Sequence, residues 1–336
     1  MTGSTTFSSL NDVQAIGLGC MNLSHAYGRP PSREDAQKVL LRALEIGVRH
    51  FDTAALYGFG KNEILLGEVL SKRRDEFFLA SKGGMGGVDG VRVIDGRPET
   101  IMRMCDESLR SLKTEVIDLY YLHRLDKKVP IEDSMGAMKT LLQQGKIRAI
   151  GLSEVSAVTL RKAHAVHPIA AVQSEYSLWS RNAEVAVLGA CNELGVTFVA
   201  FSPLARGFLT DSDIDPDAFA EKDIRRGMPR FQEPHFAKNC ELLPGYRALA
   251  REAGCTSAQL ALAWLLHRHP GIHVIPGTTS SDHLEENFKA LDISLSNSVM
   301  SRVDQLINAT TVSGPRYNAA TQAEIDTEEI VLAASA

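Results

Sequence analysis

The chain has 336 residues, which is enough for one or two domains and excludes a mini-protein. Its 44% hydrophobic and 23% charged residues are typical of a globular protein, so disorder, a collagen helix or a coiled coil is excluded as the main state. The 36 basic and 41 acidic residues give a net charge of −5 without a long block of like charges, so we expect a small-molecule partner and neither nucleic acid nor membrane.

The cysteines and the N-terminal segment bear on where the protein works. Five scattered cysteines without a C-x-x-C pair are typical of free thiols in a reducing compartment: Cys20, Cys105, Cys191, Cys240 and Cys255. The N-terminus is polar and has neither the basic nor the apolar region of a signal peptide, and no apolar run reaches the ~18 residues of a membrane span. We therefore expect a cytoplasmic protein.

Short apolar runs alternate with helix-like segments along the whole chain. The runs suit strands that are buried on both faces, and the intervening segments repeat apolar residues with helical spacing, as Val39, Leu40 and Ala43 do. Eight such units predict an α/β fold, a (β/α)8 TIM barrel around an eight-stranded parallel sheet. The predicted strands are 15–18, 48–51, 77–80, 117–122, 148–152, 170–173, 197–201 and 272–275.

Helix signals and glycines favour the barrel over a doubly wound open sheet. Ser32 is a candidate N-cap of the first helix, and Gly47 follows the last periodic residue of that helix. An open sheet of the dinucleotide-binding type needs a G-x-G-x-x-G turn after its first strand. Only Gly17 and Gly19 are present there, without the third glycine.

Two stretches interrupt the regular alternation. Residues 206–240 are polar, rich in proline and aspartate, and longer than a βα loop needs, which predicts an insertion on the catalytic rim. Residues 312–336 are rich in Ala, Thr and Glu and contain SGPRY, and we expect a tail that folds back over the barrel mouth. Residues 1–311 are interpreted as a single barrel that carries the insertion.

In such a barrel the chemistry lies at the carboxyl ends of the strands. Asp52 and Tyr57 follow the second predicted strand, Lys82 the third and His123 the fourth. Each alone has an ordinary structural explanation, as a helix cap, a half-buried aromatic, a solvated strand end or a core histidine. Together, a nearby cation lowers the pKa of a tyrosine from about 10, and a carboxylate orients that cation. The set predicts a phenol that acts as a general acid near neutral pH.

These residues lie in motifs that closely resemble the aldo-keto reductases. FDTAALYGFGKNEILLGEVL is followed by FFLASKGG and IDLYYLHR, and the resemblance continues through GLSEVS, AVQSEYSLWSR, FVAFSPLARGFL and IPGTTSSDHLEEN to residue 290. The chain is most similar to the bacterial branch with a GPRY-type C-terminal element. The resemblance implies an oxidoreductase that uses NAD(P)H to interconvert an aldehyde or ketone and the alcohol.

The resemblance also implies a catalytic tetrad of Asp52, Tyr57, Lys82 and His123. Tyr57 would donate the proton in reduction and accept it in oxidation. Lys82, paired with Asp52, would lower the pKa of Tyr57, and His123 would orient the substrate carbonyl while the nicotinamide C4 delivers a hydride.

The cofactor residues come from the same resemblance. Ser153 and Gln173 would bind the nicotinamide carboxamide, Phe201 would stack on the ring, and Glu154 stands where many relatives carry Asn. Backbone N–H groups of residues 202–207 would reach the pyrophosphate. The further cofactor-binding residues, which include the adenine contacts at 286 and 287, are Cys20, Met21, Asp52, Ser202, Pro203, Leu204, Gly207, Gly277, Thr278, Thr279, Ser280, His283, Glu286 and Asn287.

The choice between NADP and NAD depends on the last loop. Several relatives carry basic residues there for the 2′-phosphate, whereas His283 is the only candidate cation of this segment. NADP(H) is still expected, because the family prefers it and the hydroxyls and N–H groups of a helix start can bind phosphate. Use of NAD as well stays open.

Substrate specificity is less defined than the chemistry. Met21, Tyr57, His123 and Trp179 are expected to line the substrate pocket, together with the insertion around Phe231 and the C-terminal tail. They specify only a partly apolar cleft. The substrate, the reaction direction and the oligomeric state therefore stay open.

Two further motifs have a simpler explanation than a binding site. The run 82–87 is rich in glycine, but a P-loop places its lysine after the glycines, so a mobile loop is expected. His267, His269 and His273 do not share a helix face, so no metal site is expected.

Two other functions are alternatives to the reductase. Glu154 and Glu175, near two strand ends, are candidates for the carboxylate pair of a barrel glycosidase, although only two tryptophans are available for sugar stacking. A cofactor-binding regulatory subunit with little turnover is the second alternative, and the intact tetrad argues against it.

Overall fold

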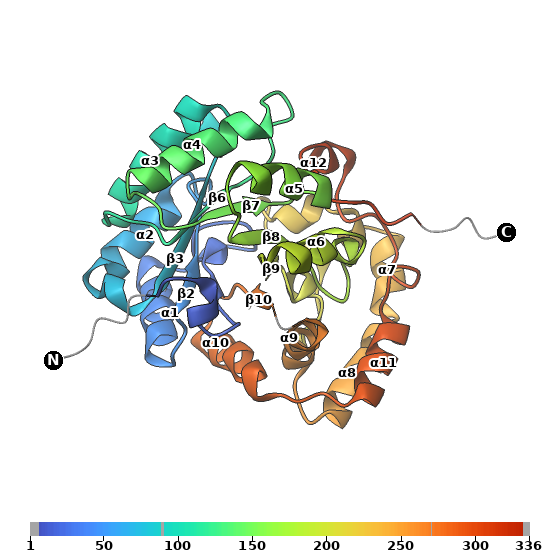
Figure 1. Ribbon diagram of the computed structural model, residues 1–336. Helices are drawn as coiled ribbons and strands as arrows, with labels where there is room; N and C mark the ends of the chain where they lie inside the picture. The colour runs from blue at the N-terminus through green and yellow to red at the C-terminus, as the bar shows by residue number, and fades with distance from the viewer. Residues whose placement is uncertain (1–6, 89–90, 270, 332–336) are drawn as a thin grey trace.

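The computed structural model describes residues 7–88, 91–269 and 271–331. Eight parallel strands form one sheet in the order β1-β2-β3-β6-β7-β8-β9-β10, and helices surround it (Figure 1). A parallel bridge between Ile16 and Val274 joins the first strand to the last and closes the barrel. The predicted (β/α)8 TIM barrel is thus confirmed. The strands are β1 (Leu18–Gly19), β2 (His50–Asp52), β3 (Phe78–Gly83), β6 (Leu119–Leu122), β7 (Ile150–Ser153), β8 (Ala171–Glu175), β9 (Thr197–Phe201) and β10 (Ile272–Ile275).

The strands form at the predicted apolar runs because both faces of the sheet are buried. Successive side chains of a strand point to opposite faces. Phe78 and Ala80 of β3 belong to the cluster inside the barrel with Val199 of β9, whereas Leu79 and Phe198 belong to the larger cluster that the helices cover. This burial on two faces explains the continuous apolar runs.

The first helix begins and ends at its predicted signals. Ser32 Oγ accepts a hydrogen bond from the N–H of Asp35 at 3.1 Å, and Gly47, with φ of 98°, follows the helix end. Within the described residues, no helix combines the length and the apolar character needed to cross a membrane. The helices are α1 (Arg33–Glu45), α2 (Lys61–Leu70), α3 (Pro98–Leu112), α4 (Ile131–Gln143), α5 (Ala157–Val166), α6 (Val187–Leu194), α7 (His235–Cys240), α8 (Leu243–Glu252), α9 (Ser257–Arg268), α10 (Ser281–Phe288), α11 (Asn297–Leu306) and α12 (Ala319–Ala323).

Most of the glycine-rich run 82–87 belongs to two strands, so its prediction as a loop is wrong. Residues 82 and 83 belong to β3, and β4 (Met85–Val88) pairs with β5 (Val91–Ile94) in an antiparallel hairpin. A Cβ atom on Gly83 would clash with the hydroxyl of Tyr120, and one on Gly87 would clash with the ring of Phe59. The glycines are explained by close packing.

The 206–240 segment contains short 3-10 turns and α7, and it contacts the loop that follows β1. The N–H of Gly28 donates to Asp223 Oδ2 at 2.8 Å, and the N–H of Ile224 donates to the carbonyl of Ala26 at 2.9 Å. The segment therefore packs against the loop after β1 at the carboxyl end of the barrel.

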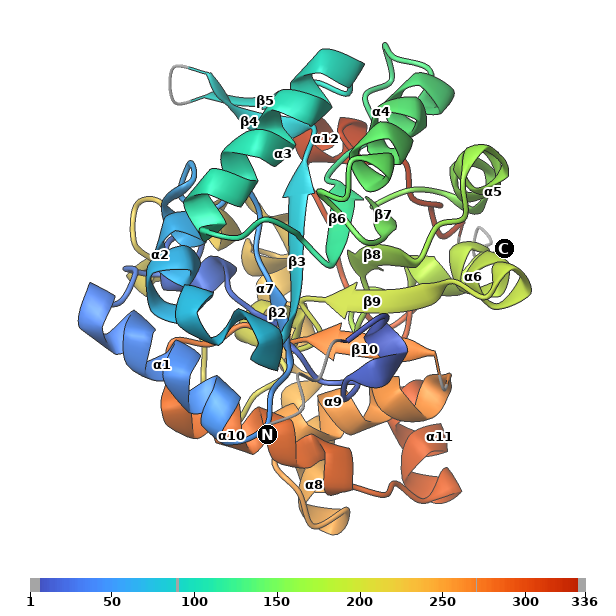
Figure 2. The same cartoon turned by 60° about the vertical axis from the view of Figure 1, so that its left-hand side comes forward.

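The C-terminal segment lies at the same end. Figure 2 shows α12 and the β4-β5 hairpin near the arrowhead of β3. Arg92 of β5 forms an ion pair with Glu324, and Lys127 donates to the carbonyl of Ala323 at 2.9 Å. These contacts place the segment beside the strand ends that carry the candidate site.

Candidate active site

The four predicted tetrad residues come together at the carboxyl end of the strands. Asp52 is the last residue of β2, Lys82 is the last but one of β3, and His123 directly follows β6. Tyr57 lies in the turn between β2 and α2. The alternation that directs Phe78 inward also directs Lys82 inward, because the two are an even number of residues apart.

Lys82 is fully buried and donates to an acceptor with each of its three N–H bonds. Its Nζ lies 2.5 Å from Asp52 Oδ1, 2.9 Å from the carbonyl oxygen of Thr53 and 3.0 Å from Tyr57 Oη. An ammonium group has three donors, so all of them are used. Since Tyr57 Oη accepts from Lys82, its own hydrogen is free to point into the cavity.

The pKa of Tyr57 differs from its prediction. Burial raises the pKa of Tyr57 above the ordinary value of about 10, and the positive charge of Lys82 opposes this rise without reversing it. Burial also opposes the charge on Lys82, but Asp52 and Tyr57 raise the pKa of Lys82 above its ordinary value. At neutral pH the phenol is therefore protonated and the lysine is charged.

His123 is a neutral side chain beside Tyr57. Its ring meets the Tyr57 ring edge-on with centroids 5.8 Å apart, and its Nδ1 is buried without a hydrogen-bond partner in the described structure. Burial, with the charges of Arg124 and Lys82, lowers the pKa of His123 well below its ordinary value. A neutral imidazole can donate one hydrogen bond to a carbonyl oxygen held near Tyr57.

A cavity of about 980 Å³ opens at this end of the barrel. It is lined by the loops after β1, β2, β9 and β10, by the 206–240 segment and by the C-terminal segment. The predicted residues in its wall are Met21, Asp52, Tyr57, His123, Ser153, Gln173, Phe201, Ser202, Pro203, Leu204, Gly207, Gly277, Thr278, His283, Glu286 and Asn287.

Three predicted cofactor residues do not line this cavity. Cys20 is completely buried beneath the loop after β1, because its thiol packs with the apolar core. Thr279 is exposed on the surface. Ser280 is the N-cap of α10, where its Oγ accepts from the N–H of His283 at 3.4 Å. That helix end therefore uses the hydroxyl predicted for phosphate.

Trp179 is not in the cavity wall, so its prediction as a substrate residue is wrong. Its indole stacks on Phe208 with centroids 4.2 Å apart and meets Phe231 edge-on at 5.4 Å. Trp179 and Phe231 are each 4% exposed. The 206–240 segment supplies both phenylalanines, and burial of the three rings against one another removes them from the pocket.

Ser153 and Gln173 reach the cavity but already have protein partners. Gln173 Nε2 donates to Asp52 Oδ2 at 2.7 Å, and Ser153 Oγ accepts from Arg124 at 3.2 Å. Gln173 therefore holds the second oxygen of the carboxylate that binds Lys82. The amide oxygen of Gln173 and the hydroxyl hydrogen of Ser153 are the groups left for a ligand.

The loop after β9 offers fewer free donors than the prediction assumed. The N–H groups of Ala205 and Gly207 donate to carbonyls inside the loop at 2.9 and 3.0 Å, and Pro203 has no N–H. Ala205, Arg206 and Gly207 all have positive φ, which turns successive N–H groups toward one side. Leu204 and Arg206 are left as the N–H donors for an anion in this part of the described structure.

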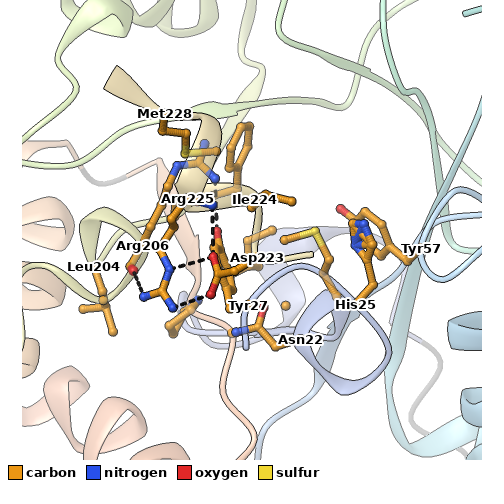
Figure 3. Close-up of a pocket in the computed structure, with 18 of the residues that line it drawn as sticks. Asn22, His25, Tyr27, Tyr57, Leu204, Arg206, Asp223, Ile224, Arg225 and Met228 are labelled. Carbon is orange, nitrogen blue, oxygen red and sulfur yellow. Dashed lines mark hydrogen bonds and ion pairs between the residues drawn. The ribbon is translucent and has the colours of Figure 1, made fainter. Parts of the chain in front are cut away.

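Aromatic and charged side chains of two loops meet across the cavity, away from Tyr57 (Figure 3). Arg206 donates to Tyr27 Oη at 3.0 Å, and Arg225 donates to the carbonyl of Arg206 at 3.3 Å. Arg225 also pairs with Asp223 at 2.7 Å. This network joins the loop after β1 to the 206–240 segment across the cavity.

Glu154 and Glu175 are buried and ion-paired, which does not favour the glycosidase. Arg316 lies 2.6 Å from Glu154 Oε2 and 3.0 Å from Glu175 Oε2, and Arg206 lies 2.6 Å from Glu175 Oε2. Burial alone would raise the pKa of Glu175, but Arg206 and Arg316 hold it well below its ordinary value. A glycosidase acid needs a raised pKa, so this pair is structural.

Several cavity residues were missed in the sequence. Arg124 follows His123 directly in the LHR motif, where its position beside a strand end was the available signal. Lys222 and Arg226 of the 206–240 segment also line the cavity, although the cofactor prediction considered cations of the last loop only. The 206–240 segment was predicted to lie on the rim, but no local pattern shows which of its side chains face the cavity.

Comparison with known proteins agrees with this geometry. The sequence pattern of the Aldo/keto reductase family matches residues 15–308. The chain is 43% identical over 312 residues to aldo-keto reductase yakc of Schizosaccharomyces pombe, whose name specifies NADP(+), with 91% of this chain and 92% of that protein covered.

Solved structures of similar proteins share the fold. The glycerol dehydrogenase AKR11B4 from Gluconobacter oxydans superposes with a TM-score of 0.82 at 27% identity, covering 94% of this chain and 98% of that one. An aldo-keto reductase from Klebsiella pneumoniae in complex with NADPH has a TM-score of 0.69 at 28% identity, covering 88% and 91%. The chain, with its barrel and its Asp52, Tyr57, Lys82 and His123 at the strand ends, belongs to the aldo/keto reductase family.

Proposed function

We propose that this protein reduces an aldehyde or ketone with NADPH and that Tyr57 donates the proton. Membership of the aldo/keto reductase family makes the chain an oxidoreductase of carbonyl compounds and alcohols. The observation that carries the assignment of Tyr57 is the 3.0 Å hydrogen bond that its hydroxyl accepts from Lys82, inside a cavity large enough for a cofactor and a substrate.

The residues of the cavity fit a nicotinamide dinucleotide. When bound, the reduced cofactor supplies a hydride to the carbonyl carbon. Phe201 at the end of β9 offers a ring face, Ser153 and Gln173 offer their remaining polar atoms, and the N–H groups of Leu204 and Arg206 suit a pyrophosphate. Thr278, Glu286 and Asn287 line the end at α10 and are proposed to hold the adenosine part.

The tetrad residues have distinct roles in the proposed reaction. His123 donates a hydrogen bond that orients the substrate carbonyl, and Tyr57 transfers its proton to the same oxygen as negative charge develops there. Lys82 stabilises the phenolate that this leaves. Asp52 keeps Lys82 charged and oriented, and Gln173 holds Asp52 in place through its 2.7 Å hydrogen bond.

NADPH is favoured over NADH by the relatives and by basic side chains in the cavity wall. Lys222 and Arg226 of the 206–240 segment line the cavity, and His283 lies at the start of α10. Cations are the usual partners of a 2′-phosphate. These residues are proposed to supply the positive charge that the last loop lacks. We therefore expect the activity with NADH to be lower than the activity with NADPH.

The remaining inferences concern location and organisation. The five cysteines are all free, which supports a reducing compartment and hence the cytoplasm. We infer one barrel with a rim insertion and a C-terminal segment. This segment borders the substrate end of the cavity, which is the end near Tyr57 and His123. The contacts of Glu324 and Tyr317 at that end support this division.

The experiment measures the oxidation of NADPH and of NADH with a panel of carbonyl compounds. The readout is the loss of absorbance of the reduced nicotinamide. Tyr57→Phe should lower kcat by about 100- to 10,000-fold, because the general acid is lost. Its affinity for NADPH should change little, since the ring is retained. Loss of cofactor affinity in parallel with kcat would show that Tyr57 has a structural role instead.

A further inference from the structure

Arg124 is a half-buried arginine in the cavity wall, immediately after His123. Its Nη1 donates to the carbonyl of His123 at 2.7 Å and to Ser153 Oγ at 3.2 Å. Among the described residues no carboxylate pairs with it, and its Nε and Nη2 have no acceptor and are not sealed from solvent. One edge of the guanidinium is therefore open.

The other charges around the substrate end cancel in pairs. Lys82 pairs with Asp52 at 2.5 Å, and Arg92 of β5 pairs with Glu324 of the C-terminal segment. Tyr57 and His123 are uncharged at neutral pH, as their pKa directions require. Arg124 is left as one positive charge without a counter-ion at this end of the described cavity.

The more distant cations of the cavity do not alter this balance. Arg206 pairs with Glu175 at 2.6 Å, and Arg225 pairs with Asp223 at 2.7 Å. Lys222 and Arg226 are exposed and belong to the 206–240 segment. Arg124 is thus the half-buried cation of the cavity wall whose charge has no protein partner in the described chain.

The open edge of Arg124 has the shape of a carboxylate site. The Nε–H and Nη2–H bonds of a guanidinium are nearly parallel and match the two oxygens of a planar carboxylate. Arg124 lines the same cavity as Tyr57 and His123, and its positive charge is close enough to act on the pKa of both groups. Leu56, Phe59 and Met85 line the same cavity and offer apolar surface to a carbon skeleton.

We propose that Arg124 binds a carboxylate of the substrate, so that the preferred substrates are aldehydes or ketones that carry a carboxylate a few carbons from the carbonyl. The proposal rests on the proposed function for the position of the carbonyl, between Tyr57 and His123. Arg124 determines specificity through a group of the substrate that does not react.

The test compares isosteric charged and neutral substrates. We would measure kcat/KM with NADPH for 4-oxobutanoate against 4-oxobutanamide, and for 4-formylbenzoate against 4-formylbenzamide. We expect the acid to exceed the amide by about tenfold or more in at least one pair, as one charge-assisted bidentate contact allows. Arg124→Met should bring the acid-to-amide ratio to about 1, mainly by raising KM for the acid. Arg124→Lys should keep part of the preference for the acid.

A matched control removes a guanidinium without changing the net charge. Arg92→Met combined with Glu324→Gln deletes the neighbouring ion pair, and it should leave the acid-to-amide ratio near its original value. Equal values of kcat/KM for acid and amide in the original protein would overturn the proposal. So would a ratio that survives Arg124→Met.

Binding measurements separate this proposal from the proposed function. The affinity for NADPH, followed by fluorescence, should be similar in Arg124→Met, and a large loss with an unchanged acid-to-amide ratio would make Arg124 a cofactor residue. If no carbonyl compound turns over, the proposed function fails. Calorimetry with 4-formylbenzoate and its amide still decides the carboxylate site: selective binding of the acid that Arg124→Met removes supports it, and equal binding contradicts it.

Discussion

At the scale of single residues, Lys82 influences the proposed chemistry through the pKa of Tyr57. Burial raises the pKa of Tyr57 above about 10, and Lys82 limits that rise. Because reduction needs the protonated phenol, kcat/KM for reduction should stay level through neutral pH and fall only above about pH 10. In Lys82→Met the fall should move to still higher pH. The pH dependence of kcat/KM in both proteins checks this.

The oxidation direction provides the control for the same residue. Alcohol oxidation needs the phenolate, so its rate near neutral pH should fall about tenfold for each unit by which Lys82→Met raises the pKa of Tyr57. Gln173→Met removes a bond to Asp52 without removing the ammonium, and it should shift the profile much less. An unchanged profile in Lys82→Met would contradict the assigned role of Lys82.

Among the elements, the C-terminal segment is attached to the barrel by a buried ion cluster. Arg316 joins Glu154 after β7 to Glu175 of β8, and both side-chain pairs are at most 5% exposed. Removing one partner of a buried pair leaves an uncompensated charge, at a cost of about 3–5 kcal/mol. Arg316→Met should therefore lower the free energy of unfolding by that amount in urea titrations.

A compensating substitution tests the electrostatic origin of this loss. Arg316→Met together with Glu154→Gln removes the carboxylate that would otherwise be left with only the N–H of Glu175 as a partner. The double variant should recover part of the stability, because Glu175 still has Arg206. Equal losses in the single and double variants would show that packing of Arg316, and not its charge, stabilises the segment.

For the molecule as a whole, two histidines inside the barrel make stability depend on pH. Burial lowers the pKa of His50 to about 3 and that of His273 to about 4. In the unfolded chain both protonate near pH 6.5, so the unfolded state binds more protons below that pH. The free energy of unfolding should be insensitive to these groups above pH 6.5 and should fall as the pH decreases from 6.5 toward 4.

The contribution of one histidine can be isolated from the slope of the free energy of unfolding against pH. His50→Asn should reduce the pH dependence between pH 6 and 4 by about 1.4 kcal/mol per pH unit, the value for one proton. The exposed His283→Asn is the control and should keep the original slope. Chemical denaturation at several pH values measures both, and an unchanged slope in His50→Asn would refute the assignment. The slope is informative even if the substitution lowers stability at every pH.

Local residue order was enough to predict the barrel and to predict that the four proposed tetrad residues lie at one end of it. A strand that is buried on both faces must be apolar throughout, so each of the eight runs was visible in the sequence. Parallel strands also bring their carboxyl ends to one side, which is why Asp52, Lys82 and His123 could be placed together without coordinates. The close approach of Gly83 to Tyr120 was not visible, because the run 82–87 has the composition of a loop.

The charge balance of the site was decided by the tertiary structure. Whether Arg124 has a counter-ion, whether Glu154 is free, and whether Trp179 faces a ligand all depend on segments outside the local sequence, such as Arg316 and Phe208 in two different loops. The pKa of Tyr57 depends on how deeply the closed barrel buries it, and burial outweighs the nearby ammonium. Sequence by itself determined which chemical groups lie at the strand ends, because backbone periodicity is local. Folding decided which of those groups keep a free charge or a free hydrogen bond, because desolvation and ion pairing are set by distant neighbours.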